Sequence, residues 1–284
     1  MFPVEENPDI NRKARVVIPP IERVYREVSE RIDDFEECAV CLTPEQAMEE
    51  ASRCLHCPQP SPCIGACPMG NNISEALWLI EQGRFIEAAE LYRRTNPMPE
   101  ICGRVCPSQA SCETSCVLTR RERPINTRAL EAFVADYQRQ TTGVPLPEVA
   151  PSSGKRVAVI GAGPAGLAAA EDLAVAGHEV TVFEEKPAAG GLLVYGIPNF
   201  KLSKDLVQWK VNWLADLGIK FVFNTRIGRD ITLDELMERE GFDAVFIGTG
   251  AQVEASLGIP GEDLGRVHRA LDFLAGANLP DHLL

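Results

Sequence analysis

The chain has 284 residues, enough for about two domains that each bury their own core, which excludes a small peptide held together by disulfides. Its 28 Lys and Arg residues stand against 41 Asp and Glu, and a net charge of −13 would repel phosphate backbones, so no nucleic-acid partner is expected. Hydrophobic residues make up 45% of the chain, but the most apolar stretch, 157–170, is Gly-rich and ends at two acidic residues, so no membrane segment is expected.

The N-terminus carries acidic residues before any basic one and has no apolar run. This pattern predicts the absence of a secretory signal and a cytoplasmic location. All ten cysteines lie between Cys38 and Cys116. In a reducing compartment such clustering favours metal ligation over disulfides.

Helical patterns dominate the first half of the chain. Thr43, Pro44 and Gln46 form an N-cap, a first-turn proline and a capping-box partner, which predict a helix running to Arg53. Further helical patterns cover 74–82, 84–94 and 126–139. Since no strand pattern competes, residues 1–140 are expected to form an α-helical domain with cysteine-rich loops.

Eight of the cysteines form two groups, Cys54-x2-Cys57-x5-Cys63-x3-Cys67 and Cys102-x3-Cys106-x5-Cys112-x3-Cys116. Two groups of four indicate two metal centres. Zinc is the alternative, because it accepts closed four-thiolate sites. The three-residue gaps and the prolines after three of the cysteines favour 4Fe-4S clusters, and we expect a ligand of one group to cross to the other cluster, as in two-cluster ferredoxins.

Three further residues of this region carry weaker signals. Cys38 and Cys41 have no second pair to complete a site, so ordinary partly buried thiols are expected. His56 lies between two candidate ligands, and we expect a solvated loop histidine; the alternative is a hydrogen bond that tunes a cluster. No nucleophile, base and orienting group stand in a recognisable pattern, so hydrolytic chemistry is not expected.

Residues 141–154, rich in Pro, Ser, Thr and Gly, predict a linker. Short apolar runs then alternate with helical patterns, which predicts a parallel, doubly wound sheet and an α/β Rossmann-like domain over residues 155–284. The expected strands cover 156–160, 179–184, 220–224 and 243–249, and the expected helices 164–176, 202–217 and a short one opened by a capping box at Thr232 and Glu235 and ended by Gly241.

A Gly-rich turn joins the first of these strands to its helix. Gly161 permits the tight turn, Gly163 lets the backbone approach a pyrophosphate and Gly166 lets helix and strand pack closely. The helix N-terminus, with Pro164 and Ala165, offers N–H groups and a positive dipole. Glu184 closes the next strand and suits a ribose 2′-hydroxyl, which predicts FAD or NAD rather than NADP.

Later glycines add to the nucleotide site without deciding between FAD and NAD. Gly190 and Gly191 precede Leu192, where a backbone could approach a second planar or phosphate group; a loop that merely needs positive φ is the alternative. Gly250 ends the strand sequence DAVFIGTG, where a small residue again allows close contact with a nucleotide.

These motifs together resemble the small (β) subunit of glutamate synthase and its relatives, which include the large subunit of NADH-dependent ferredoxin:NADP oxidoreductase and the N-terminal part of dihydropyrimidine dehydrogenase. The resemblance covers residues 30–275 and rests on RCLHC, CIGACP, EICGRVCP, VIGAGPAGL, GGLLVYGIPNFKL, NTRIGRD, DAVFIGTGA and GIPGEDL. It implies FAD at the Gly-rich turn, Glu184 and the Gly191–Leu192 loop.

The resemblance also implies how the cysteines divide between two 4Fe-4S clusters. One cluster would bind Cys54, Cys57, Cys63 and Cys116, and the other Cys67, Cys106 and Cys112. In relatives the remaining ligand can be an amide or carboxylate from the helix after the last cysteine, and Glu131 stands at the matching place. Glu131 is therefore the expected eighth ligand, with Cys102 as the alternative.

The resemblance predicts an electron-transfer subunit of an NAD(P)H-dependent oxidoreductase, in a hetero-oligomeric complex with other oxidoreductase subunits. Relatives continue past GIPGEDL into a second dinucleotide domain, whereas this sequence ends at Leu284 with no second Gly-x-Gly-x-x-Gly after Gly166. NAD(P)H is therefore expected on a further segment or another chain, and no residue of the chain is assigned a catalytic role. The alternatives are a standalone cluster electron carrier and a non-catalytic assembly module.

Overall fold

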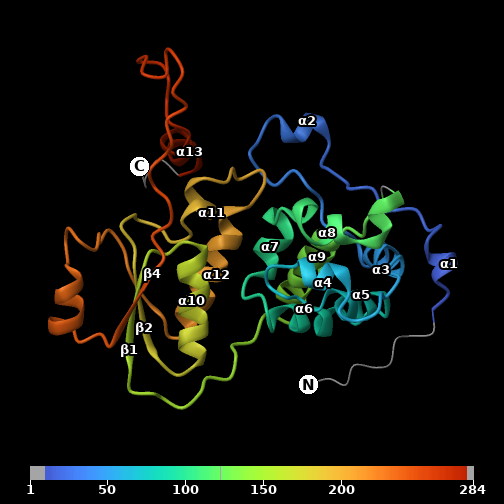
Figure 1. Ribbon diagram of the computed structural model, residues 1–284, viewed down its shortest axis with the longest axis horizontal. Helices are drawn as coiled ribbons and strands as arrows, with labels where there is room; N and C mark the ends of the chain where they lie inside the picture. Colours follow the sequence, from blue (N-terminus) through green and yellow to red (C-terminus); the bar gives the residue numbers. More distant parts are fainter. Residues whose placement is uncertain (1–9, 122, 280–284) are drawn as a thin grey trace. The chain divides into compact units, whose positions relative to one another are not determined.

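The computed structural model describes residues 10–121 and 123–279 (Figure 1). The N-terminal residues on which the prediction of a missing secretory signal rests, and the C-terminal limit of the second expected domain, lie outside the described residues. The chain divides into two compact units, one of Met1–Asp34 and Cys38–Val144 and one of Phe35–Glu37 and Pro145–Leu284. In the part of the chain that is described, no helix combines the length and the apolar character needed to span a bilayer.

The first unit is helical. Its helices are α1 Arg12–Arg15, α2 Val28–Arg31, α3 Pro44–Ser52, α4 Pro62–Ala66, α5 Ile73–Glu81, α6 Phe85–Arg93, α7 Pro99–Val105, α8 Cys112–Ser115 and α9 Thr127–Thr141, with 3-10 turns η1 Ser108–Ala110 and η2 Val117–Arg121. Its core joins apolar residues of α3, α5, α6 and α9. The ring of Phe85 packs edge-on to Phe133 and to Tyr137, with both centroid distances 5.0 Å.

The longer predicted helices are confirmed, and α3 begins with the expected capping box: the Gln46 N–H donates to Thr43 Oγ1, and the Thr43 N–H donates to Gln46 Oε1. The expected cysteine-rich loops are interrupted by short helices that carry three of the cysteines. Cys63, Cys102 and Cys112 belong to α4, α7 and α8. These helices have four to seven residues, too few for a hydrophobic period to reveal them in the sequence.

A buried ion pair fixes the approach to α9. Arg53 and Glu50 are each 1% exposed, and Arg53 Nη1 lies 2.5 Å from Glu50 Oε1. Arg53 also donates to the Arg123 carbonyl at 2.7 Å, and the Asn126 N–H donates to Glu50 Oε1 at 2.8 Å. The pair thereby ties the end of α3 to the segment from which α9 starts.

Helices α7 and α9 meet at Gly103, where a Cβ would lie 2.4 Å from the backbone N of Ala132. We expect Gly103→Ala to lower the free energy of unfolding by about 1–3 kcal/mol, because the added methyl forces two backbones apart. Gly276→Ala is the matched control, since its Cβ would meet no atom within 4 Å. Chemical denaturation of both variants measures the difference; equal stabilities would contradict a tight α7–α9 contact.

The second unit contains a parallel four-stranded sheet of order β3-β2-β1-β4. The strands are β1 Arg156–Ile160, β2 Glu179–Phe183, β3 Lys220–Val222 and β4 Ala244–Ile247, and the helices are α10 Pro164–Val175, α11 Leu192–Tyr195, α12 Lys204–Asp216 and α13 Ala270–Asn278. All four predicted strands are confirmed, the last three with fewer residues than expected. The capping box at Thr232 forms, but it opens a π-helical turn, η3 Glu235–Arg239.

The two faces of the sheet are covered differently. Helices α10 and α12 pack on one face, and the η3 segment lies on the other (Figure 1). On the η3 face, Ile160 and Phe183 join Leu236 and Phe242 in one apolar cluster. Because β1 is buried on both sides, the carboxyl end of this strand and the turn after it are held rigidly.

Candidate functional site

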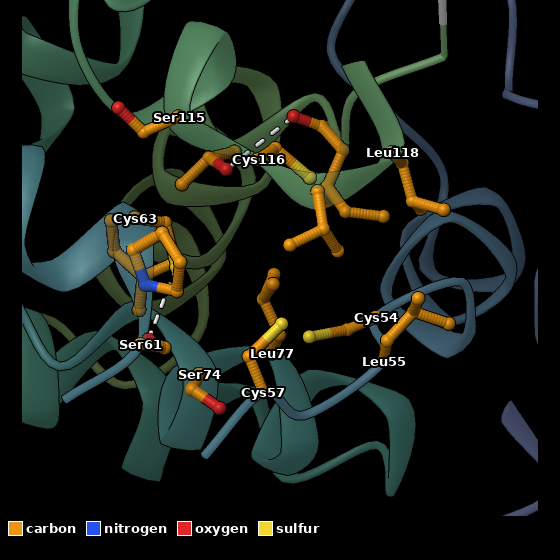
Figure 2. Close-up of a pocket in the computed structure, with 15 residues that line it drawn as sticks. Cys54, Leu55, Cys57, Ser61, Cys63, Ser74, Leu77, Ser115, Cys116 and Leu118 are labelled. Atoms are coloured by element: carbon orange, nitrogen blue, oxygen red, sulfur yellow. Dashed lines mark hydrogen bonds between the residues drawn. The ribbon is translucent and has the colours of Figure 1, made fainter. Parts of the chain in front are cut away.

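Four thiols of the first unit line one pocket (Figure 2). Cys54 follows the end of α3, Cys63 lies in α4 and Cys116 follows α8, while Cys57 lies in the loop between α3 and α4. Figure 2 shows Cys54 and Cys57 pointing into the pocket from one wall and Cys116 pointing in from the opposite wall. The tertiary structure thus joins three cysteines of the first sequence group with the last cysteine of the second.

Hydrogen bonds to sulfur fix two of these thiols. The His56 N–H donates to Cys54 Sγ at 3.5 Å, and Ser61 Oγ shares a hydrogen bond of 3.3 Å with Cys63 Sγ. N–H and O–H groups directed at sulfur stabilise a thiolate that binds a metal cluster.

The electrostatics of this pocket favour a positively charged occupant. Burial, with smaller contributions from the neighbouring thiols of Cys63, Cys57 and Cys116, raises the pKa of Cys54 to about 12. Burial also raises the pKa of Cys57, which the Arg12 guanidinium partly opposes. Four thiols, one buried and three partly buried, repel one another as thiolates and become stable together when a metal centre supplies the compensating charge, so the donor set fits an iron–sulfur cluster.

A second group of thiols lies in the same unit. Burial, with smaller contributions from Glu113, Cys106 and Cys67, raises the pKa of Cys112 to about 12. Burial likewise raises the pKa of Cys106, with contributions from Glu131 and Cys67. Cys67, Cys106 and Cys112 therefore lie close enough to interact, and three thiols, one buried and two partly buried, suit the same class of cluster.

Both candidates for the remaining ligand lie beside this second group. Glu131, on α9, is 6% exposed, and its Oε1 accepts hydrogen bonds from Asn96 Nδ2 at 2.7 Å and Asn71 Nδ2 at 3.2 Å. Burial raises the pKa of Glu131 to about 7. Cys102, on α7, has its pKa raised to about 12 by burial and next by Glu131, and its thiol donates to Asn96 Oδ1 at 3.6 Å.

Asn71 and Asn96 orient the Glu131 carboxylate, and the sequence patterns did not single them out. Both are buried, at 3% and 2% exposure. The only signal in the sequence is an amide residue just outside a helix, which is equally typical of an exposed turn. Their role depends on contacts with a helix far along the chain.

The remaining cysteines and the histidine have separate outcomes. Cys38 is partly buried, as expected, but Cys41 is exposed. The expectation of a solvated His56 is wrong, because the residue is 3% exposed and its ring packs edge-on to Trp78 at 5.4 Å. Packing against α5, which the local sequence does not reveal, buries His56.

Within residues 10–121 and 123–279, no three His, Cys, Asp or Glu side chains are grouped as ligands of a single metal ion.

The Gly-rich turn of the second unit requires its glycines for steric reasons. Gly161 has φ +97°, and a Cβ there would lie 2.6 Å from the Gly248 carbonyl oxygen. A Cβ on Gly166 would lie 1.9 Å from the Gly161 carbonyl oxygen. The turn between β1 and α10 therefore packs against itself and against the end of β4, as a dinucleotide-binding turn does.

Gly163 differs from its neighbours because the space beside it is open. It is the N-cap of α10, directly before Pro164 and Ala165, and the nearest atom to a Cβ there would be the Gly191 Cα at 3.9 Å. Gly191 has φ +52° and approaches Gly163 from the other side. The helix N-terminus, the open space and the second glycine form a cradle that a Cβ would fill, which fits the pyrophosphate of a dinucleotide.

Glu184 is buried directly after β2, where its carboxylate accepts the Ala162 N–H at 2.8 Å and the Lys186 N–H at 3.0 Å. These bonds hold an acid beside the Gly-rich turn. The two outer candidates are less enclosed: Leu192 is 51% exposed, and Gly250, at φ +68°, follows β4.

Lys204 binds the backbone of the loop that follows Gly191, a role that no sequence pattern indicated. Its Nζ donates to the carbonyls of Leu193 at 3.0 Å and of Ile197. Burial lowers its pKa to about 8. The side chain thereby binds carbonyls at both ends of the segment that follows Gly191.

Two protein-family models match different parts of the chain. Residues 31–143 match the family described as dihydropyrimidine dehydrogenase domain II, 4Fe-4S cluster, and residues 155–283 match pyridine nucleotide-disulphide oxidoreductases. The glutamate synthase [NADPH] small chain of Bacillus subtilis is 42% identical over 252 residues, which cover 86% of this chain and 50% of that protein. The chain belongs to the glutamate synthase small chain-like family.

Two further similar proteins have different names. The putative oxidoreductase UacF of Escherichia coli is 42% identical over 87% of this chain and 38% of its own length. A solved structure of FprA from Mycobacterium tuberculosis in complex with NADPH is 30% identical, with a TM-score of 0.39, over 44% of this chain and 28% of that one. The chain spans about half of the length of the glutamate synthase small chains that it matches.

Proposed function

We propose that this chain is the iron–sulfur and FAD-binding part of an NAD(P)H-dependent oxidoreductase, and that it carries electrons between FAD and a partner protein through two 4Fe-4S clusters. The observation that carries the proposal is the pocket in which Cys116 meets Cys54, Cys57 and Cys63, on a chain that also holds an open dinucleotide cradle. The names of the matched relatives support the same class of enzyme.

Each cluster has its own proposed ligand set. The first would bind Cys54, Cys57, Cys63 and Cys116, and the second Cys67, Cys106, Cys112 and Glu131. These residues would hold the iron by thiolate or carboxylate bonds. Burial raises the pKa of Cys54 to about 12 and that of Glu131 to about 7. Two ligand sets of different donor type are expected to give the two clusters different reduction potentials.

The second unit would bind the dinucleotide at the N-terminus of α10. Gly163 and Gly191 leave room for the pyrophosphate, and the free N–H groups of the helix end donate to it. The Glu184 carboxylate would accept a hydrogen bond from a ribose hydroxyl. When bound, FAD supplies the two-electron chemistry of hydride acceptance, and the clusters supply single-electron transfer.

The matched small chains carry "[NADPH]" in their names, and a small chain implies a larger partner. We accordingly propose that the complete enzyme uses NAD(P)H, bound on a further segment or on another chain, and that another oxidoreductase subunit receives the electrons. No catalytic residue is proposed within this chain, because binding, positioning and tuning are the roles that its side chains support.

Anaerobic purification, followed by measurement of iron, acid-labile sulfide, zinc and FAD in one preparation, tests the proposal. We expect about eight irons, about eight sulfides and one FAD per chain. Iron and sulfide at that level with no FAD, even after reconstitution with excess FAD, would instead favour a cluster-only electron carrier. Zinc in place of iron would overturn the proposal in favour of an assembly module.

A further inference from the structure

Two arginines of the short helix α1 bind the backbone of the loop that carries Cys54 and Cys57. Arg12 Nε donates to the Leu55 carbonyl at 2.9 Å, and its Nη2 donates to the His56 carbonyl at 3.0 Å. Arg15 Nη1 donates to the Cys54 carbonyl at 3.0 Å. Three consecutive carbonyls of the loop are therefore bound by two guanidinium groups.

Arg15 also ties this loop to the helices on both sides. It donates to the Ser52 carbonyl, at the end of α3, at 2.7 Å. Its two terminal nitrogens bind the two carboxylate oxygens of Glu81, the last residue of α5, at 2.8 Å and 2.7 Å. Arg15 and Glu81 are only 12% and 18% exposed, so this ion pair of two parallel hydrogen bonds is shielded from solvent. The planar geometry of the guanidinium restricts the loop that it binds.

The conformation that these arginines hold is an unfavourable one. His56 has φ +43°, which is a left-handed conformation. This conformation is energetically unfavourable for a residue with a Cβ, so it persists only where the surrounding contacts impose it. The same conformation directs the His56 N–H at Cys54 Sγ. One loop conformation therefore both presents its carbonyls to the two arginines and directs the His56 N–H at the Cys54 sulfur.

The charges of the two arginines differ in effect. Arg15 is paired with Glu81, so its contribution is mainly to hold the loop. The Arg12 guanidinium binds the carbonyls of the two residues directly before Cys57 and, among the described residues, has no carboxylate fork of the kind that Arg15 makes, so its charge lies beside this proposed ligand. A positive charge beside an iron–sulfur cluster stabilises the reduced, more negative form and so raises the reduction potential.

We propose that Arg12 and Arg15 are positioning residues for the first cluster: both hold the Cys54–Cys57 loop in its ligating shape, and Arg12 in addition raises the reduction potential of that cluster. This inference rests on the proposed function, since it concerns the cluster bound by Cys54, Cys57, Cys63 and Cys116. Both arginines precede residue 31, where the match to the 4Fe-4S family begins.

The test compares anaerobically purified variants by iron release to a chelator and by potentiometric titration followed by electron paramagnetic resonance. In Arg12→Gln we expect four of about eight irons to leave about tenfold faster, the scale on which outer-shell partners alter metal affinity, and the first cluster to become harder to reduce. Arg12→Lys keeps the charge but cannot bind two carbonyls with one planar group. We therefore expect faster iron release while the reduction potential of the first cluster stays near its original value.

Arg15 is tested together with its partner, because removing the arginine alone would leave Glu81 as a buried, uncompensated charge. The double variant Arg15→Gln/Glu81→Gln is expected to release the same four irons faster, with far-UV circular dichroism confirming that the helices persist. Lys13→Gln is the matched control, since Lys13 is an exposed residue of the same helix and carries the same charge. It should keep both iron release and potential unchanged.

The outcomes separate this inference from the proposed function. An unsubstituted chain that binds about eight irons, with Arg12→Gln and Lys13→Gln equal in release rate and potential, would overturn the role of the arginines alone. Equal acceleration of all the irons would also overturn it, because the effect would then be a general loss of stability. An unsubstituted chain that binds no iron would overturn both.

Discussion

Replacing Glu131 with alanine is expected to remove one whole cluster, lowering the iron content from about eight to about four per chain. The physical reason is that three thiols, those of Cys67, Cys106 and Cys112, cannot complete a four-ligand set. Glu131 is the proposed fourth ligand because it acts electrostatically on Cys106, and its Oε1 is held by two amide donors inside the core. Iron and acid-labile sulfide in the anaerobically purified variant measure the effect.

Two further substitutions make this expectation specific. Cys102→Ser is expected to keep both clusters, because Cys102 is the alternative ligand and not the proposed one. Glu131→Gln keeps the length of the side chain and one ligating oxygen, so it should retain about eight irons with a changed potential for one cluster. Full iron in Glu131→Ala together with loss in Cys102→Ser would assign the position to Cys102.

The alanine variant needs a stability control, because Asn71 and Asn96 would lose their acceptor in the core. Such buried donors cost about 1–3 kcal/mol each when they are left unpaired. Far-UV circular dichroism distinguishes the two cases: loss of one cluster leaves the helices intact, whereas general unfolding reduces the helical signal and also releases the first cluster.

Gly163→Ala is expected to weaken FAD binding by about a hundredfold without destabilising the metal-free and flavin-free chain. The added Cβ would meet no protein atom closer than 3.9 Å, but it would fill the space into which the pyrophosphate must come. Loss of charge-assisted hydrogen bonds worth about 3 kcal/mol in total corresponds to that change in affinity. Titration with FAD, followed by quenching of flavin fluorescence, measures the dissociation constant.

Gly166→Ala provides the contrast. Its Cβ would lie 1.9 Å from the Gly161 carbonyl oxygen, so the turn itself must distort and the thermal midpoint of the second unit should fall. Gly163→Ala should leave that midpoint unchanged. Retention of FAD at the original affinity in Gly163→Ala would show that the nucleotide does not approach the backbone there.

Much of the fold follows from local patterns. The capping box at Thr43, the alternation of strands and helices after residue 155 and the Gly-rich turn each depend on residues within a few positions of one another, and the structure contains all three. The short helices α4, α7 and α8 lacked such a pattern, because their prolines and cysteines form no repeating apolar face.

The candidate site divides in the same way. The glycine positions of the nucleotide site could be predicted because the strand, the turn and the helix that need them are consecutive in the chain: Gly161 has a positive φ, and a Cβ on Gly166 would lie 1.9 Å from the Gly161 carbonyl oxygen. The cysteine spacing indicated two metal centres, but spacing by itself left open which thiols share one; the division into ligand sets came from family resemblance. The burial of His56 against Trp78 was missed, since it depends on how α5 packs.

The amino-acid sequence by itself determined the chemistry available to this protein: thiols in two groups, a glycine turn before a helix, and an acid after the next strand. Only the tertiary structure decided which groups meet. Cys116 reaches Cys54 because helices between them fold back, and Arg12 reaches the Leu55 carbonyl in the same way. Contacts between residues far apart in the chain depend on how whole helices pack, and no local pattern of residue types specifies that packing.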